Sequence, residues 1–153
     1  MNTLKQAKES GSISLGNSKM PGTTFAVSAK RCNVGSGLAK VKGSVCEKCY
    51  ALRIQRFRKN VDKAWELNYQ KWITSDYDTW VASMTYQIKK HKQDYHRWFD
   101  SGDLESNKML DAIIQVCYNS PEVKHWLSGI GVSLRSISSA SLVGNQCLTS
   151  GVL

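Results

Sequence analysis

Hydrophobic positions follow two different periods along this chain. Three short segments rich in β-branched and aromatic residues predict strands, at residues 23–28, 95–99 and 123–127. Elsewhere, apolar residues recur every three or four positions, which predicts three amphipathic helices. The first runs over about 50–72, with a stripe that includes Phe57, Asn68 and Trp72. The second begins at a Ser75 cap and ends near His91, and the third covers about 106–119. Strands that alternate with helices indicate crossover connections. We therefore expect an α/β fold with a parallel sheet of about three strands and long amphipathic helices.

The two ends of the chain lack such patterns. Residues 1–20 are polar and rich in Gly and Ser, which predicts a flexible leader that ends at the Pro21-Gly22 turn signal. Residues 128–153 contain seven Ser, four Gly and a single charged residue, Arg135. They show no helical stripe of apolar residues. Only residues 132–142 show a weak alternation of apolar and polar positions, which would fit one or two strands. We expect a folded domain over 21–127, followed by an irregular, atypical tail.

The composition is that of one globular domain. The chain has 153 residues, of which 41% are hydrophobic and 22% are charged. Its longest apolar runs are four or five residues, whereas a membrane span needs about 20. The N-terminus lacks the apolar segment of a secretory signal. These features predict a cytoplasmic protein that does not enter a membrane.

The net charge of +9 is concentrated in one segment. Ten Lys and Arg residues face only two acids between Lys30 and Lys63. Such a local excess predicts an anionic partner, either nucleic acid or a nucleotide-like ligand. The cations most suited to phosphate contact lie among aromatic residues in the first predicted helix: Arg53, Arg56, Arg58 and Lys59. The alternative is that the aromatic residues are core and the cations are the solvated side of the same helix.

The cysteines divide into a cluster and two isolated residues. Cys46-Glu47-Lys48-Cys49 is a C-x-x-C motif, and Cys32 lies fourteen residues upstream of it. An odd total of five, without an export signal, argues against a disulfide framework. The motif is compatible with zinc, an iron–sulfur cluster, a redox dithiol or buried thiols. Three thiolates would leave one coordination position open on zinc, or one iron open in a four-iron cluster. The nearby lysines should lower the pKa values of the thiols. Cys117 is expected in the core, and Cys147 has no evident role.

A second polar motif follows the second predicted strand. Ser101-Gly102-Asp103 stands where ligands gather in parallel α/β folds, at the carboxyl ends of the strands. Its glycine permits close approach of the backbone, and its carboxylate can accept from an ammonium group or a ribose hydroxyl. Alternatively, it is an ordinary turn in which Asp103 caps the third helix. His96 and His125 lie within predicted strands and are expected to be structural, with a role at the site as the alternative.

These motifs together resemble a known family. The segments Lys19-Met20-Pro21-Gly22, Cys46-x-x-Cys49-Tyr50-Ala51-Leu52 and Trp98-Phe99-Asp100-Ser101-Gly102-Asp103 resemble the bacteriophage gene product 88 family, with a match over about 19–127. The layout is also similar to the opening of a radical S-adenosylmethionine (SAM) barrel. That resemblance implies that Cys32, Cys46 and Cys49 hold a 4Fe–4S cluster, with Tyr50 against it. It also implies that Ser101, Gly102 and Asp103 approach SAM.

The chain departs from that pattern in two ways. Its cysteines are more widely spaced, and an eight-stranded barrel needs about 250 residues, so we expect only part of a barrel. The tail after Leu127 resembles the product of a reading-frame change or a truncation. With only part of a barrel, we expect the protein either to be inactive or to need a partner. The alternative function is a basic module that binds nucleic acid or a host protein, with its cysteine loop held together by zinc or a cluster.

Overall fold

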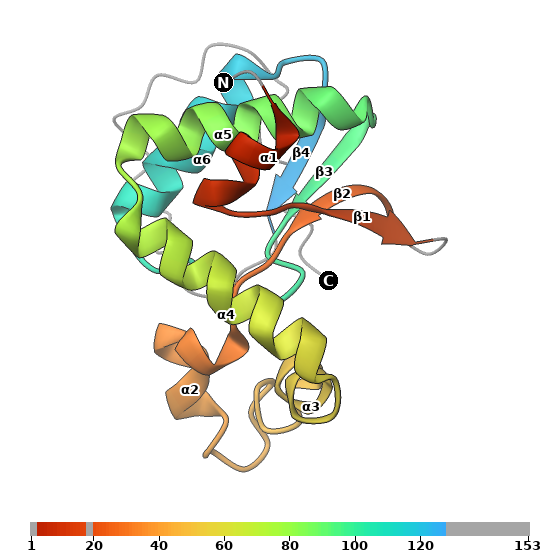
Figure 1. Ribbon diagram of the computed structural model, residues 1–153. Coiled ribbons are helices and arrows are strands. Elements are labelled where there is room, and N and C mark those ends of the chain that lie inside the picture. Colours follow the sequence, from red (N-terminus) through yellow and green to blue (C-terminus); the bar gives the residue numbers. More distant parts are fainter. Residues whose placement is uncertain (1–2, 18–19, 128–153) are drawn as a thin grey trace.

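The computed structural model describes residues 3–17 and 20–127, which form a mixed α/β fold (Figure 1). Within this part the sheet has four strands in the order β1-β2-β3-β4. β1 pairs antiparallel with β2, whereas β2, β3 and β4 are parallel. The strands are β1 (Ser14–Asn17), β2 (Met20–Phe25), β3 (Tyr95–Trp98) and β4 (Lys124–Leu127). The predicted α/β class and its three parallel strands are confirmed.

Six α-helices and two 3₁₀ turns connect and cover the described part of the sheet. They are α1 (Leu4–Ala7), η1 (Lys8–Ser10), η2 (Ala29–Arg31), α2 (Asn33–Leu38), α3 (Tyr50–Phe57), α4 (Lys59–Thr74), α5 (Tyr77–His91) and α6 (Asn107–Asn119). Ser106 caps α6 by accepting from the Met109 N–H at 3.3 Å, at the predicted start. Asp76, rather than Ser75, caps α5 through the Thr79 N–H at 2.9 Å.

The core lies between the sheet and the helices α5 and α6. Phe25 and Trp98 are register partners on adjacent strands, and both are fully buried. Trp80 of α5 packs edge-on against Phe25, with ring centroids 5.7 Å apart. Because side chains alternate along a strand, Thr24, Arg97 and Trp126 lie on the opposite face of the sheet.

The segment expected to be a flexible leader has a regular structure over residues 3–17. It forms α1, η1 and the edge strand β1, and Ile13 joins the core. Its backbone is paired by buried amides of the helices. Asn68 both accepts from the Ser12 N–H and donates to the Ser12 carbonyl, each at 2.9 Å, and Gln87 donates to Gly11 at 2.8 Å. The composition of this segment does not indicate its structure, because the side chains that pair with its backbone lie more than fifty residues away in the sequence.

The long helix predicted over about 50–72 is divided in two. Arg58 separates α3 from α4 with an extended backbone, at φ −113° and ψ 88°. The break removes Phe57 from the apolar stripe, and this side chain is 73% exposed. The predicted stripe is therefore wrong at Phe57, although Asn68 and Trp72 are buried as it requires. The predicted tail, residues 128–153, lies outside the described residues.

Candidate functional site

The carboxyl ends of β2 and β3 are held together by backbone contacts. The Phe99 N–H donates to the Phe25 carbonyl at 2.8 Å, and the Val27 N–H donates to the Ser101 carbonyl at 3.0 Å. Gly102 has φ +83°, and a Cβ on it would lie 2.7 Å from the Val27 carbonyl oxygen. Only glycine fits a positive φ and so close an approach. The strand-end motif therefore lies directly against the start of the segment that carries the cysteines.

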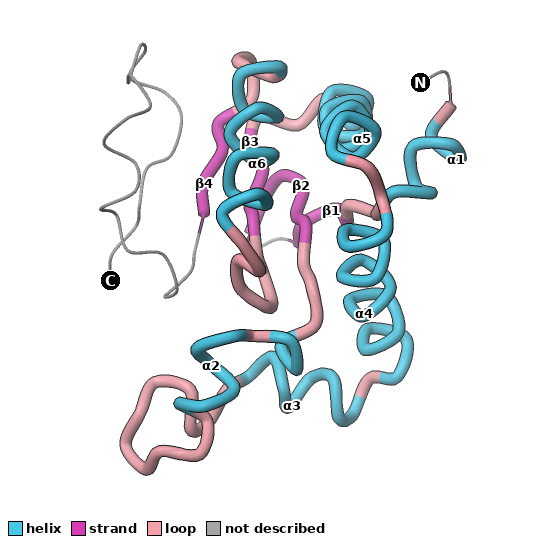
Figure 2. The backbone as a smooth tube through the Cα atoms, turned by 90° about the vertical axis from the view of Figure 1, so that its left-hand side faces the viewer, coloured by secondary structure: helices cyan, strands magenta, loops and turns pink. Residues whose placement is uncertain are grey.

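That segment forms a separate layer, here called the cysteine lobe (residues 32–58). It contains α2, a series of turns and α3, and it lies beyond the carboxyl ends of the parallel strands (Figures 1 and 2). None of the side chains of residues 33–49 is buried. The lobe is attached through η2 at one end and through the contact of α3 with α4 at the other.

A pocket of about 400 Å³ lies between the cysteine lobe and the strand ends. Every residue that the sequence assigned to a metal or cofactor lines it: Cys32, Cys46, Cys49, Tyr50, Ser101, Gly102 and Asp103. The parallel pairing of β2 with β3 explains this convergence, because it brings two loops some fifty residues apart to one edge. Asp103 does not cap α6, since Ser106 does.

Two of the sulfur atoms approach the same point. A Cβ built on Gly35 would lie 3.7 Å from Cys32 Sγ and 3.6 Å from Cys46 Sγ. Cys46 and Cys49 are joined by a tight turn, in which the Cys49 N–H donates to the Cys46 carbonyl at 3.2 Å. All three cysteines are half-buried and free. Within the described residues, however, no three His, Cys, Asp or Glu side chains are arranged to hold a single metal ion.

The Cys32 thiol is not activated by the neighbouring lysines. Its pKa is raised to about 11, chiefly by burial and then by Asp103, Cys49 and Cys46 in that order. The expectation that lysines lower this pKa is therefore wrong for Cys32. Burial also raises the pKa of the Asp103 carboxyl. Burial is the largest cause of both shifts, because the pocket shields the two groups from water.

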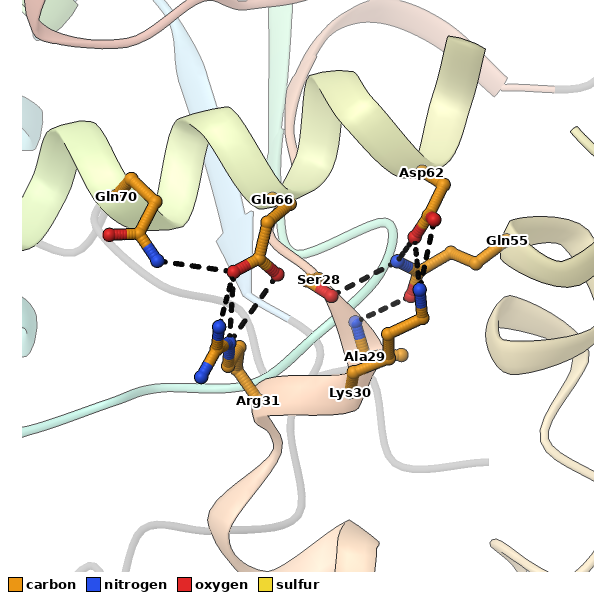
Figure 3. Close-up of polar contacts among 8 residues, drawn as sticks. All are labelled: Ser28, Ala29, Lys30, Arg31, Gln55, Asp62, Glu66 and Gln70. Carbon is orange, nitrogen blue, oxygen red and sulfur yellow. Dashed lines mark hydrogen bonds and ion pairs between the residues drawn. The ribbon is translucent and has the colours of Figure 1, made fainter. Parts of the chain in front are cut away.

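The two cations that precede Cys32 in the sequence form ion pairs with α4 (Figure 3). Lys30 pairs with Asp62 at 2.7 Å, and Arg31 pairs with Glu66 at 2.6 Å. Both acids belong to α4, so these pairs attach the start of the loop to that helix. Glu66 holds Arg31 in place with two hydrogen bonds, from Nε and Nη2. The two pairs attach the start of the loop to α4, whereas the cations that line the pocket itself are Lys48 and Arg97.

A buried glutamine fixes the same segment from the other side. Gln55 of α3 is fully buried, and its Oε1 accepts from the Ala29 N–H at 2.8 Å. Its Nε2 donates to Ser28 Oγ at 3.0 Å and to Asp62 Oδ1 at 2.7 Å (Figure 3). Because Cys49 immediately precedes α3 and Cys32 immediately follows η2, Gln55 sets the separation of the two cysteines. This role of Gln55 was not predicted from the sequence. The position of Gln55 one turn after Ala51, on the buried side of α3, would have indicated it.

Tyr50 and Arg97 close the rim of the pocket. The Tyr50 hydroxyl donates to the Asp100 carbonyl, and burial raises the pKa of this phenol. Arg97 pairs with the Asp100 carboxylate at 2.6 Å and stacks over Trp126 at 4.9 Å from the ring centroid. Arg97 also lines the pocket and was not anticipated from the sequence. The Ser101 hydroxyl is buried in the same wall and has no hydrogen-bond partner among the described residues.

The two strand histidines and Cys117 lie away from this pocket. His96 Nδ1 is 2.7 Å from Thr23 Oγ1, and His125 Nε2 is 3.0 Å from Ser120 Oγ. Both rings are on the helix-covered face of the sheet, next to Trp98. Their structural interpretation is confirmed, and neither lines the pocket. Cys117 is buried in α6 as expected, and Cys147 lies outside the described residues.

The predicted phosphate-contacting residues are all exposed. Arg53 and Arg56 lie on the outer side of α3, and Arg58 and Lys59 follow at the break before α4. Within the described part of the chain, none of the four forms an ion pair with a carboxylate. These four exposed cations of α3 and the start of α4 are here called the α3 basic surface (Arg53, Arg56, Arg58 and Lys59).

These features define an α/β protein with a cysteine-lined pocket at the carboxyl edge of a mostly parallel sheet. A family model described as Gene product 88 matches residues 2–127. The chain therefore belongs to the gene product 88 family, the phage family that its motifs resemble. No curated protein and no solved structure shows a significant match. Over the residues that the structure describes, every helix is too short or too polar to cross a membrane.

Proposed function

We propose that the pocket binds an iron–sulfur cluster through Cys32, Cys46 and Cys49. The observation that carries this proposal is the convergence of all three cysteines and the Ser101-Gly102-Asp103 turn on one pocket. No other pair of loops in the described chain combines thiols with a strand-end carboxylate in this way. Parallel α/β folds place their ligands at this edge of the sheet.

A cluster places a smaller demand on the positions of the sulfur atoms than a single ion does. One zinc ion requires its thiolates about 2.3 Å from a common point, and the described residues contain no such group. In a 4Fe–4S cluster each thiolate binds a different iron, so the sulfurs need not converge on one point. The raised pKa of Cys32 is consistent with this role, because bound iron would stabilise the thiolate that burial disfavours.

The cysteine lobe also needs a bound group for its own stability. Val34, Val41 and Val45 are all exposed, and α2 buries no side chain. A segment without a core of its own is ordinarily held by a metal or a disulfide. The free cysteines of this lobe provide the ligands for a metal.

Three cysteine ligands leave one iron of such a cluster open, and we propose that SAM occupies it. Asp103 is a half-buried carboxylate that can accept from the ammonium group of SAM, and the unpaired Ser101 hydroxyl lies beside it. A cluster of this kind supplies one-electron chemistry when it is bound. The protein would then resemble the first part of a radical SAM barrel, with Tyr50 against the cluster. Zinc, as a purely structural staple, is the alternative occupant.

The metal is tested by anaerobic purification, with iron, acid-labile sulfide and zinc measured per chain. We expect brown protein with about four irons per chain, and substitution of Cys46→Ala should abolish the cluster. Cys117→Ala is the matched control, because Cys117 is buried far from the pocket in α6, and this variant should retain its iron. Circular dichroism of both variants separates loss of metal from loss of fold. Colourless protein with one zinc would support the staple, and unchanged metal content in Cys46→Ala would refute the whole site.

A second role, binding of a polyanion, is favoured by the α3 basic surface. Its four cations are exposed and have no carboxylate partner among the described residues. We propose that it binds phosphate groups of a nucleic acid or a nucleotide-like ligand, and a host protein with an acidic face would compete for it. Binding of heparin that weakens with salt, in protein freed of metal, tests this role separately from the cluster.

A further inference from the structure

The outer face of α3 combines arginines with an exposed aromatic ring. Ala51 and Gln55 form the buried side of the helix. Arg53 and Phe57 are four residues apart and lie on the opposite side. Phe57 is 73% exposed, whereas Tyr50 at the start of the helix lines the pocket. Arg56 and Arg58 are the neighbours of Phe57 in the sequence, and both are exposed.

The charge of this region is not neutralised locally. Asp62 and Glu66 of α4 are engaged by Lys30 and Arg31. Glu47, the remaining acid of the basic segment, accepts from the Gly43 N–H at 2.8 Å. The arginines of α3 therefore face solvent without a carboxylate from any described element packed against them, and they attract a polyanion over the whole surface.

Phe57 is exposed although the apolar stripe predicts it in the core. The break at Arg58 places its ring in water. A duplex presents phosphates to such a surface but keeps its bases stacked inside. An unpaired strand offers both phosphates and base faces, and bases stack on exposed aromatic rings. Arginines beside an aromatic ring are therefore more complementary to a single strand than to a duplex.

We infer that α3 binds single-stranded nucleic acid, with a base stacked on Phe57 and phosphates on Arg53, Arg56 and Arg58. This inference rests on the proposed polyanion-binding role of the same surface. It adds the stacking of a base on Phe57, a contact that a general polyanion-binding site does not need. DNA and RNA strands share this chemistry, and they are compared directly in the test.

The inference is tested with fluorescence anisotropy of labelled oligonucleotides of about 20 residues, which exceeds the footprint of a single binding module. The full-length chain is titrated with single-stranded DNA, single-stranded RNA, duplex DNA of the same sequence, and heparin as competitor. We expect the single strands to bind more tightly than the duplex. The tighter of the DNA and RNA arms identifies the natural class of strand.

Two variants separate stacking from charge. Phe57→Ala should weaken single-strand binding about 10-fold to 100-fold and leave the salt dependence unchanged. The double substitution of Arg56→Gln and Arg58→Gln should reduce the salt slope by about 1.4, at roughly 0.7 per phosphate contact. Tyr118→Ala is the matched control, because Tyr118 is also an exposed aromatic residue, on α6 and away from the basic surface. It should bind as the unchanged protein does.

Three outcomes would overturn the inference. If Phe57→Ala binds like Tyr118→Ala, no base stacks on this ring. If the duplex and heparin bind as tightly as the single strands, the surface is a general polyanion site, and the proposed second role survives without the inference. If no polyanion binds at low salt, both fail. Phe57 lies outside the core, so loss of fold would not explain a weakened affinity.

Discussion

Substitution of Gln55→Leu tests how the cysteine lobe is held against the sheet. Gln55 is fully buried and makes three hydrogen bonds, to the Ala29 N–H, Ser28 Oγ and Asp62 Oδ1. Leucine has a similar volume but can make none of them. Asp62 retains Lys30, and Ser28 retains a hydrogen bond with Glu66. The main loss is therefore the buried Ala29 N–H, which is left without a partner.

An unpaired buried donor costs about 1–3 kcal/mol. We expect Gln55→Leu to lower the free energy of unfolding by about 2 kcal/mol, which corresponds to about 6 °C in Tm for a chain of this size. The same change should lower iron retention, because Gln55 sets the separation between the segments that carry Cys32 and Cys49. Urea unfolding followed by circular dichroism gives the first quantity, and iron per folded chain gives the second.

Gln87→Leu is the control for the second effect. Gln87 is also fully buried, and it accepts from the Ile13 N–H and donates to the Gly11 carbonyl, far from the pocket. It should destabilise the fold by a similar amount and leave iron retention in the folded fraction unchanged. A Gln55→Leu variant within about 0.5 kcal/mol of the unchanged protein would refute the reasoning. Equal loss of iron in both variants would show that Gln55 has no special role in placing the cysteines.

Two further predictions concern pH and backbone geometry. Burial lowers the pKa values of His96 and His125 in the folded state, so below pH 6.5 the unfolded chain binds more protons. Stability should therefore fall with decreasing pH, by up to about 1.4 kcal/mol per pH unit for each histidine. His125→Gln should remove the contribution of one histidine from this pH dependence, as measured by urea unfolding at a series of pH values. If the stability of the unchanged protein does not vary with pH in this range, the lowered histidine pKa values are contradicted. Gly102→Ala should destabilise by about 3 kcal/mol, because its Cβ would meet the Val27 carbonyl at 2.7 Å. Gly43→Ala has the same φ of +83° with open space around it and should cost only about 1 kcal/mol, so equal thermal shifts would show that the close contact is unimportant.

Much of the fold was predictable because its signals are local. The apolar period of α6 and its Ser106 cap lie within one segment, and so do the β-branched and aromatic residues of the three parallel strands. The position of the strand-end motif followed from a general property of parallel sheets. It placed Ser101-Gly102-Asp103 and the cysteine loop at the same edge, and both line one pocket in the structure.

Two predictions failed where the local pattern did not decide the structure. A polar Gly- and Ser-rich segment predicts mobility until Asn68 and Gln87, on two later helices, pair with its backbone. Tertiary contacts override the local pattern there. The stripe that contains Phe57 predicts a continuous helix, yet the chain breaks at Arg58 and exposes that ring.

The sequence by itself determined the class of the fold, the family, the charge excess and the identity of the candidate ligands, because each depends on composition, period or motif. The tertiary structure decided the environment of those ligands. Burial beside Asp103, with Lys30 and Arg31 drawn away by α4, raises the pKa of Cys32 where a lysine-rich loop predicts the opposite. Charge in a protein acts through distance and desolvation, and neither is encoded in the order of residues along the chain.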